Sequence, residues 1–172
     1  MKNSITPTTA ERVMREKDLI FSRTDTTGRI TYANNIFIEF SGYKQEELIG
    51  AQHNIIRHPD MPRAIFKLLW DTIQNKQECC AYVKNMSKDG GFYWVYATVT
   101  PSYDAQGNLA GYTSWRSKPK ASGVEAAKAL YAQMLEAETR AGPANAIAAS
   151  RKILNDLLQE KGMSYDEFVR SI

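Results

Sequence analysis

His53–Pro62 (HNIIRHPDMP) is the most informative part of this 172-residue chain, because it places a dense polar cluster between two apolar-patterned segments. It holds both histidines of the protein, together with Arg57 and Asp60. Pro59 disfavours helical geometry at the residue before it, so any helix preceding it is expected to be short. Asp60 is placed to cap the next helix, with Pro62 in its first turn. Such a cluster either holds a charged ligand or solves a capping problem.

Toward the N-terminus, the pattern predicts a β-hairpin followed by short helices. Strands are expected at Leu19–Thr24 and Arg29–Tyr32, around a turn. Asn34 is a good N-cap for the run NIFIEF, whose apolar residues fall at helical spacing. One helical turn is expected at Gln45–Leu48, and Thr9–Lys17 can form a short helix ahead of the first strand.

Toward the C-terminus, a long helix and three strands are expected. The helix runs from Asp60 to about Asn75 with an apolar stripe. Strands are expected at Cys79–Ser87, Phe92–Thr100 and Leu109–Arg116, the first two joined by the turn sequence KDGG. Two strands, short helices and three further strands predict an α+β domain with one five-stranded antiparallel sheet and helices on one face.

The character of the chain changes after this domain. A linker is expected at Lys118–Gly123, followed by amphipathic helices at Val124–Ala141 and Ala144–Glu160 and a short helix at Tyr165–Arg170. We therefore divide the chain into a flanking segment over residues 1–17, a domain over residues 18–118 and a helical extension over residues 119–172. The amphipathic helices suit a protein partner or a homodimer.

Composition excludes several classes of function. The net charge of +3 is mild and no Lys/Arg run forms a basic patch, which disfavours nucleic acid as a partner. No apolar run is long enough for a signal core or a membrane span. The only cysteines, Cys79 and Cys80, are adjacent and lack zinc spacing, as expected in a reducing cytoplasm. No nucleophile–base pair, P-loop or metal cluster indicates an enzyme.

The order of elements, with GYKQEELIG after the first helix and KDGG before YWV, resembles a PAS domain over roughly residues 18–118. HNIIRHPDMPRAIFKLLW, followed by VKN and YWV, is similar to the PAS domain of bacterial aerotaxis receptors and related redox sensors. The resemblance implies FAD bound without covalent attachment. It also implies a site whose polar residues are Asn34, Arg57, His58, Asp60 and Asn85. Those receptors carry a Trp where this chain has Cys79.

The residue types at this site suit a flavin dinucleotide. Arg57 offers a fixed fork for phosphate, and His58 can donate to phosphate or pack against a ring. Asn85 can donate to and accept from the amide-like edge of a flavin. Strand alternation and the apolar stripe supply the remaining candidates, which are Val95, Ala97, Val99, Phe66, Trp70 and Trp115.

Each of these residues also has a purely structural interpretation. Asp60 can orient Arg57 or only cap a helix, and Asn34 is as well explained by capping as by ligand contact. Arg57 can be a surface ion-pair partner, and Trp70 and Phe66 can be ordinary core residues.

The resemblance implies a cytoplasmic sensor of redox state, oxygen or cellular energy that relays a conformational change to a signalling partner, such as a chemotaxis-type receptor. A second interpretation is a haem-binding gas sensor with His53 or His58 as the ligand. A third is a cofactor-free PAS module for dimerisation or scaffolding. A blue-light sensor is disfavoured, because those PAS domains keep a reactive cysteine in the short helix before the long one, and this chain has none there.

Overall fold

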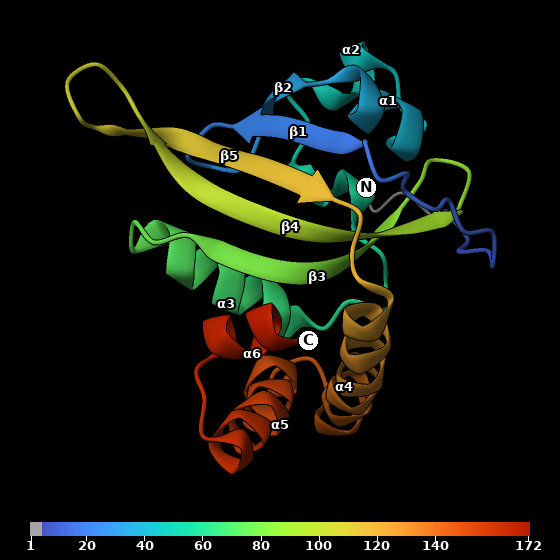
Figure 1. The fold of residues 1–172 in the computed structure, drawn as a ribbon, viewed down its shortest axis with the longest axis vertical. Coiled ribbons are helices and arrows are strands. Elements are labelled where there is room, and N and C mark those ends of the chain that lie inside the picture. The colour runs from blue at the N-terminus through green and yellow to red at the C-terminus, as the bar shows by residue number, and fades with distance from the viewer. Residues whose placement is uncertain (1–4) are drawn as a thin grey trace.

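The computed structural model describes residues 5–172 and contains a five-stranded antiparallel sheet with strand order β2-β1-β5-β4-β3 (Figure 1). The strands are β1 (Leu19–Thr24), β2 (Ile30–Ala33), β3 (Cys79–Met86), β4 (Phe92–Tyr103) and β5 (Leu109–Ser117). The α+β class and the five antiparallel strands expected from the sequence are confirmed. The strand β3 lies at one edge of the sheet, which matters for what packs beside it.

β4 is longer than its sequence suggests. It was expected to end before Pro101, but it continues through Pro101 to Tyr103 in register with β5. β3 begins at Cys79, which pairs with Val99, so β4 has only one neighbouring strand, β5, after Val99. A proline that lacks an N–H is tolerated where a strand has an open side.

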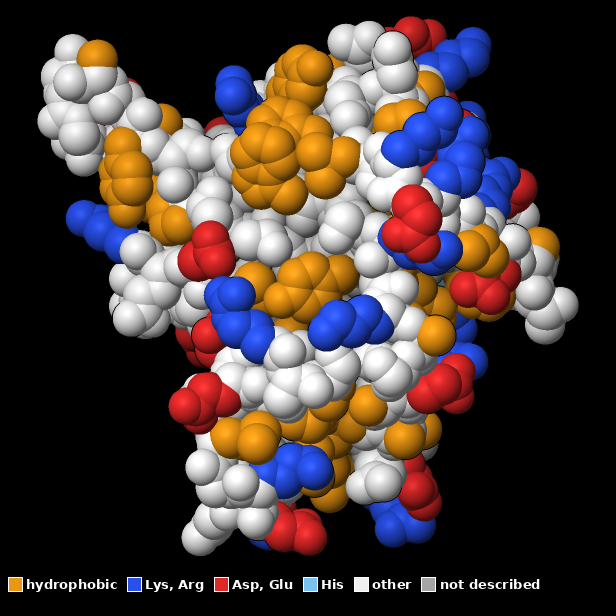
Figure 2. Space-filling model, in the orientation of Figure 1, with side chains coloured by type: hydrophobic (Ala, Val, Ile, Leu, Met, Phe, Trp, Pro, Cys, Tyr) orange, Lys and Arg blue, Asp and Glu red, His pale blue; other side chains and the backbone are white. Residues whose placement is uncertain are grey.

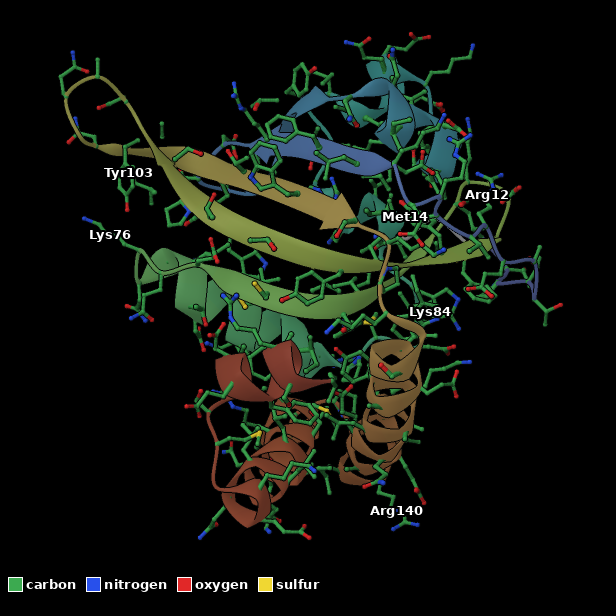
Figure 3. The ribbon with its side chains drawn as sticks, in the orientation of Figure 1. Arg12, Met14, Lys76, Lys84, Tyr103 and Arg140 are labelled. Carbon is green, nitrogen blue, oxygen red and sulfur yellow. The ribbon has the colours of Figure 1, made fainter. Side chains whose placement is uncertain are left out.

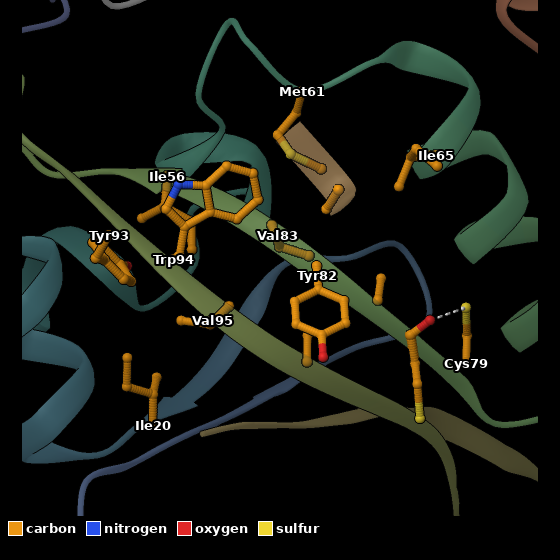
Figure 4. Close-up of a cluster of buried hydrophobic side chains, with 14 of the residues drawn as sticks. Ile20, Ile56, Met61, Ile65, Cys79, Tyr82, Val83, Tyr93, Trp94 and Val95 are labelled. Carbon is orange, nitrogen blue, oxygen red and sulfur yellow. Dashed lines mark hydrogen bonds between the residues drawn. The ribbon is translucent and has the colours of Figure 1, made fainter. Parts of the chain in front are cut away.

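Four short or medium helices cover one side of the sheet, called here the inner face. They are α1 (Asn35–Ser41), α2 (Gln45–Leu48), the 3-10 helix η1 (His53–Ile56) and α3 (Arg63–Gln74). The core lies between these helices and the sheet. Figure 4 shows part of the buried cluster, to which the strands contribute Ile20, Tyr93 and Val95 and the helices contribute Ile56 and Ile65. This burial is the main stabilising contribution to the domain.

The flanking segment before β1 is extended, so the helix expected at Thr9–Lys17 is wrong. Its backbone pairs with the start of β4: the N–H of Arg12 donates to the carbonyl of Phe92 at 2.8 Å, and the N–H of Phe92 donates to the carbonyl of Ala10 at 2.9 Å. Pairing with a strand satisfies these backbone groups at least as well as one isolated helical turn would, because short helices are marginal by themselves.

The C-terminal extension consists of α4 (Ala121–Ala141), α5 (Ala146–Lys161) and α6 (Tyr165–Ser171). These helices lie beside β3 and α3, and the far end of α4, where Arg140 is labelled, points away from the sheet (Figures 1 and 3). The hydroxyl of Tyr131 on α4 donates to the carbonyl of Tyr82 on β3 at 2.7 Å. The extension therefore covers an edge strand that would otherwise expose unpaired backbone groups. Among residues 5–172, no helix has the length and apolar character needed to cross a membrane.

Candidate functional site

A cavity of about 580 Å³ lies between the inner face of the sheet and the helices η1 and α3. Its volume falls within the range of small-molecule sites, about 300–1,000 Å³. Three segments form its walls: β3, β4 and β5 on one side, η1 with Arg57 on another, and α3 on the third. The exposed side chains among its lining mark the opening; these are Gln52, Asn54, Arg63, Lys67, Gln74 and Ile147.

The sheet side of the cavity is built from alternate residues of neighbouring strands. Ala97 pairs with Arg116, and Val99 pairs with Ser114, so these four side chains share the inner face. Ala97 and Val99 face the cavity as the alternation predicts, and their small side chains leave room there. Val95 is fully buried in the core and does not line the cavity.

Arg116 is the most unusual residue of the cavity wall. Its side chain is 2% exposed, and it lies with its guanidinium 4.4 Å above the Phe37 ring. One terminal nitrogen donates to the Ser22 hydroxyl, and the other lies 3.4 Å from Nε2 of His53. Within residues 5–172 no carboxylate pairs with this cation, and its Nε has no hydrogen-bond partner. Burial lowers the pKa of Arg116 to about 10, so the group stays charged at neutral pH.

His53 is held beside this cation in its neutral form. Its Nε2 lies 3.0 Å from the Ser22 hydroxyl, and its ring stacks on Phe37 with the centroids 5.7 Å apart. Burial, and then the positive charge of Arg116, lower the pKa of His53 to about 3. The imidazole therefore lines the cavity as an uncharged ring.

Arg57 lines the cavity nearer its opening and is integrated into the surrounding fold. Its guanidinium lies 4.5 Å above the Phe66 ring, and its Nη2 is 3.5 Å from the carbonyl of Met61. The backbone of Arg57 forms an isolated antiparallel bridge with Asn85 on β3. Two of the site residues expected from the sequence are thus side by side on the cavity wall.

Asn85 contributes an amide group to the same wall. Its side chain is nearly buried and lines the cavity. In the described part of the chain, its carboxamide has no hydrogen-bond partner. An amide so placed can donate to and accept from a ligand.

His58 and Asp60 do not line the cavity. His58 is buried, and its Nδ1 accepts the N–H of Asp60 at 3.0 Å, so its ring is committed to the local turn. Burial, followed by the charge of Lys84, lowers the pKa of His58. The Asp60 carboxylate is 2.7 Å from Nζ of Lys84, a residue labelled in Figure 3. Of these three neighbouring residues, Arg57 lines the cavity, whereas His58 and Asp60 do not.

Asp60 also does not cap α3, so that expectation is wrong. The helix begins at Arg63, with Pro62 just before it instead of in its first turn. Glu138 of α4 supplies the cap: its Oε1 accepts the N–H of Arg63 at 2.7 Å and that of Ala64 at 3.4 Å. No local sequence signal could show this contact, because the capping residue lies in a different helix.

Asn34 caps α1 and ties it to β1. Its Oδ1 accepts the N–H groups of Phe37 and Phe21, both at 3.1 Å, and its Nδ2 donates to the carbonyl of Leu19 at 2.8 Å. It does not line the cavity. Of the two interpretations open from the sequence, the structure shows the capping role.

The aromatic candidates divide between the two faces of the sheet. Phe66 and Trp70 line the cavity from α3, and Trp70 meets Tyr112 edge-on at 5.6 Å. Trp115 is on the opposite, outer face, 44% exposed and 4.6 Å from the Phe21 ring, in the apolar patch that Figure 2 shows over β1 and β5. The expectation that Trp115 contacts a ligand in the cavity therefore fails, and its neighbour Arg116 occupies the wall instead.

The two cysteines are both buried and lie outside the cavity lining. Cys79 shares a face with Val99, whereas Cys80 lies on the outer face near Thr98, at 3.6 Å between Sγ and Oγ1. Burial raises the pKa of Cys79 to about 12. Cys79 thus lies outside the cavity wall.

Comparison with known proteins agrees with this architecture. A family model described as the PAS fold matches residues 30–115, and the chain belongs to this family. The aerotaxis receptor of Escherichia coli is 36% identical over 143 residues, which is 83% of this chain and 26% of the receptor. The nitrogen fixation regulatory protein of Klebsiella pneumoniae is 30% identical over 100 residues, which is 58% of this chain and 20% of that protein. The chain thus spans about a quarter or less of these relatives.

Solved structures share the fold. The dark structure of the blue-light photoreceptor Aureochrome1 LOV superposes with a TM-score of 0.55 at 24% identity, covering 62% of this chain and 80% of that one. A PAS domain of a Colwellia psychrerythraea protein gives a TM-score of 0.54 at 21% identity, covering 59% of this chain and 86% of that one. At these identities the likeness shows the fold alone.

Proposed function

We propose that the chain is a cytoplasmic FAD-binding PAS sensor that responds to redox state, oxygen or cellular energy and relays a conformational change to a partner signalling protein. The observation that carries the proposal is that Arg116, a buried cation with no carboxylate partner within residues 5–172, faces the same cavity as the carboxamide of Asn85, which has no hydrogen-bond partner among the same residues. Isolated buried charges and unsatisfied amides are costly, so a cavity that keeps both is suited to a ligand that pairs with them.

The residues present fit a flavin. A bound flavin supplies a planar ring that accepts electrons and has one polar edge. Ala97, Val99 and Phe66 provide apolar wall for such a ring, and Asn85 can meet its amide-like edge. Toward the opening, Arg57, Arg63 and Lys67 provide the cations that a diphosphate requires.

Arg116 gives the site a means of sensing. Its fixed positive charge favours the more electron-rich state of any group held against it, because the interaction is strong in a poorly solvated interior. Arg116 and Trp115 are neighbours on β5 but face opposite sides of the sheet. A shift of β5 in response to the cavity would therefore reach the exposed outer face, where a partner can respond.

The haem alternative is less well supported by the two imidazoles. Nε2 of His53 already contacts Ser22 and lies beside the Arg116 cation. His58 does not line the cavity, and its Nδ1 accepts a backbone N–H. A haem iron needs a free imidazole nitrogen pointing into the pocket.

The test is the absorption spectrum of the purified chain, followed by chromatographic identification of any pigment released on denaturation. The proposal expects a yellow protein that releases FAD in a ratio close to one per chain. A Soret band would establish the haem sensor instead. Colourless protein that takes up no added FAD would favour the cofactor-free dimerisation module and contradict the proposal.

A further inference from the structure

We propose that Glu138 is a positioning residue for the ligand cavity, and that ligand binding and the docking of α4 and α5 are coupled through Glu138 and Ile147. This inference rests on the proposed function, because it concerns the same cavity. It assigns to the C-terminal extension a role in the site that neither its distance in sequence nor its separate helical pattern would suggest.

Glu138 is held by contacts from two other helices. Its side chain is 8% exposed, and its Oε1 accepts the N–H of Arg63 at 2.7 Å, that of Ala64 at 3.4 Å and the hydroxyl of Ser150 at 2.7 Å. Ser150 is fully buried on α5. The carboxylate therefore joins α3, α4 and α5 at one point, and no single-helix capping motif does this for α3.

Glu138 binds the N-terminal end of α3, where the exposed Arg63 belongs to the cavity lining. A carboxylate is stabilised at a helix N-terminus, where unpaired N–H groups and the helix dipole favour negative charge. In its first turn α3 supplies Arg63 and Phe66 to the cavity wall, and Trp70 follows one turn later on the same helix. Fixing the first turn of α3 therefore fixes the position of side chains that would contact a ligand.

Glu138 also influences Arg57 electrostatically. Burial lowers the pKa of Arg57, and the negative charge of Glu138 opposes that effect. Arg57 is one of the three cations that the proposed function places near a diphosphate. A change in the position of Glu138 would thus alter both the wall from α3 and the field at the opening.

The second contact is direct. Ile147, near the start of α5, is 41% exposed and lines the opening of the cavity. It lies one turn before Ser150, so the same helix carries both the partner of Glu138 and a portion of the cavity rim. Undocking of α4 and α5 would remove the cap from α3 and open this part of the rim together.

Coupling of this kind is reciprocal. If docking of the helices strengthens ligand binding by some factor, bound ligand must stabilise the docked helices by the same factor. Two quantities should therefore change together in one protein: the affinity for FAD and the hydrogen-exchange protection of residues 121–161.

The experiment uses the full chain, with FAD titrated into the apo protein by fluorescence and amide exchange measured with and without FAD. Glu138→Ala is expected to weaken FAD binding by about tenfold, because the first turn of α3 loses the carboxylate that fixes it against α4 and α5. Glu138→Gln, which keeps an acceptor oxygen but not the charge, should fall between Glu138→Ala and the wild type. Ser150→Ala provides a milder perturbation of the same contact in case Glu138→Ala does not fold.

Glu136→Ala is the matched control, because Glu136 is on the same helix but is exposed and forms a surface ion pair with Arg140. It should change the FAD affinity by less than about twofold, as is usual for surface ion pairs. FAD should also slow exchange in α4 and α5 of the wild type, and do so less in Glu138→Gln.

The outcomes separate the two proposals. If the wild type binds no FAD, the proposed function fails. If the wild type binds FAD, but Glu138→Gln and Ser150→Ala bind it equally well and FAD leaves the exchange of α4 and α5 unchanged, only the coupling is overturned.

Discussion

The connection between η1 and α3 and the strand β5 each bring one arginine to the cavity, but their surroundings differ. Arg57 stacks on Phe66, reaches the carbonyl of Met61 and lies in the field of Glu138. Arg116 is more deeply buried, contacts Ser22 and His53, and has no acidic partner in the part of the chain that the structure describes. A cation satisfied by the fold can be kept for stability. A buried cation without a counterion indicates where a ligand completes the structure.

The largest effect is expected for Arg116→Met. Loss of a charged hydrogen-bond donor in a buried site costs about 1.5–3 kcal/mol, so the affinity for FAD should fall by about 10- to 100-fold. The control is Trp115→Leu, whose side chain is adjacent in sequence but lies on the outer face. Fluorescence titration of both variants checks this expectation, and equal losses in the two would show that the cavity is not the binding site.

His53, which lies beside Arg116, should make the free energy of unfolding of the apo protein depend on pH. The folded-state pKa of His53 is lowered from 6.5 to about 3, so the unfolded chain binds the proton more readily. Its contribution to stability is complete above pH 6.5 and is lost as the pH falls toward 3, with a slope of at most about 1.4 kcal/mol per pH unit. The free energy of unfolding is measured with urea at several pH values for the apo wild type and for His53→Phe. It should depend less steeply on pH in His53→Phe than in the wild type. Parallel pH profiles would mean that His53 is not buried as a neutral ring.

Arg57→Gln tests whether the two arginines contact different parts of the ligand, when the binding of FAD is compared with that of riboflavin. If Arg57 meets the diphosphate at the opening, its loss should weaken FAD by about three- to tenfold, since the site there is partly solvated. Binding of riboflavin, which has no phosphate, should be unaffected by Arg57→Gln but weakened by Arg116→Met. Equal weakening of FAD and riboflavin by Arg57→Gln would contradict the division of roles between the two arginines.

The smallest effect is expected for Asp60→Asn, in the same connection as Arg57. Asp60 is exposed and pairs with Lys84, away from the cavity. A surface pair contributes about 0–1 kcal/mol, so FAD affinity should change by less than about twofold. If Asp60→Asn weakened FAD binding as much as Arg57→Gln does in the same titration, Asp60 would have to belong to the ligand site.

The sequence predicted the sheet, its helices and one side of the cavity because those features depend on local patterns. Alternation placed Ala97 and Val99 correctly, and the polar connection identified Arg57. Alternation along β5 does not say which alternate set faces inward, and Trp115 was chosen where Arg116 lines the cavity. That choice is fixed by pairing of Arg116 with Ala97 and Ile20, which a single strand does not reveal.

Other features depend on contacts between distant parts of the chain. The cap of α3 comes from Glu138, so the local candidate Asp60 was a reasonable but wrong choice. The extended flanking segment depends on β4 as its partner, and its own residues carry only a weak helical pattern. Tertiary contacts overrode local propensity in both places.

If Arg116 holds its charge against the ring of a bound flavin, the midpoint potential of that flavin must depend on the charge at this position. The measurement is this potential in the wild type, Arg116→Lys and Arg116→Gln, each saturated with FAD. Reduction adds electron density to the ring, which a nearby cation stabilises, so the potential should be lowest in Arg116→Gln and close to the wild type in Arg116→Lys. An unchanged or higher potential in Arg116→Gln would contradict the account.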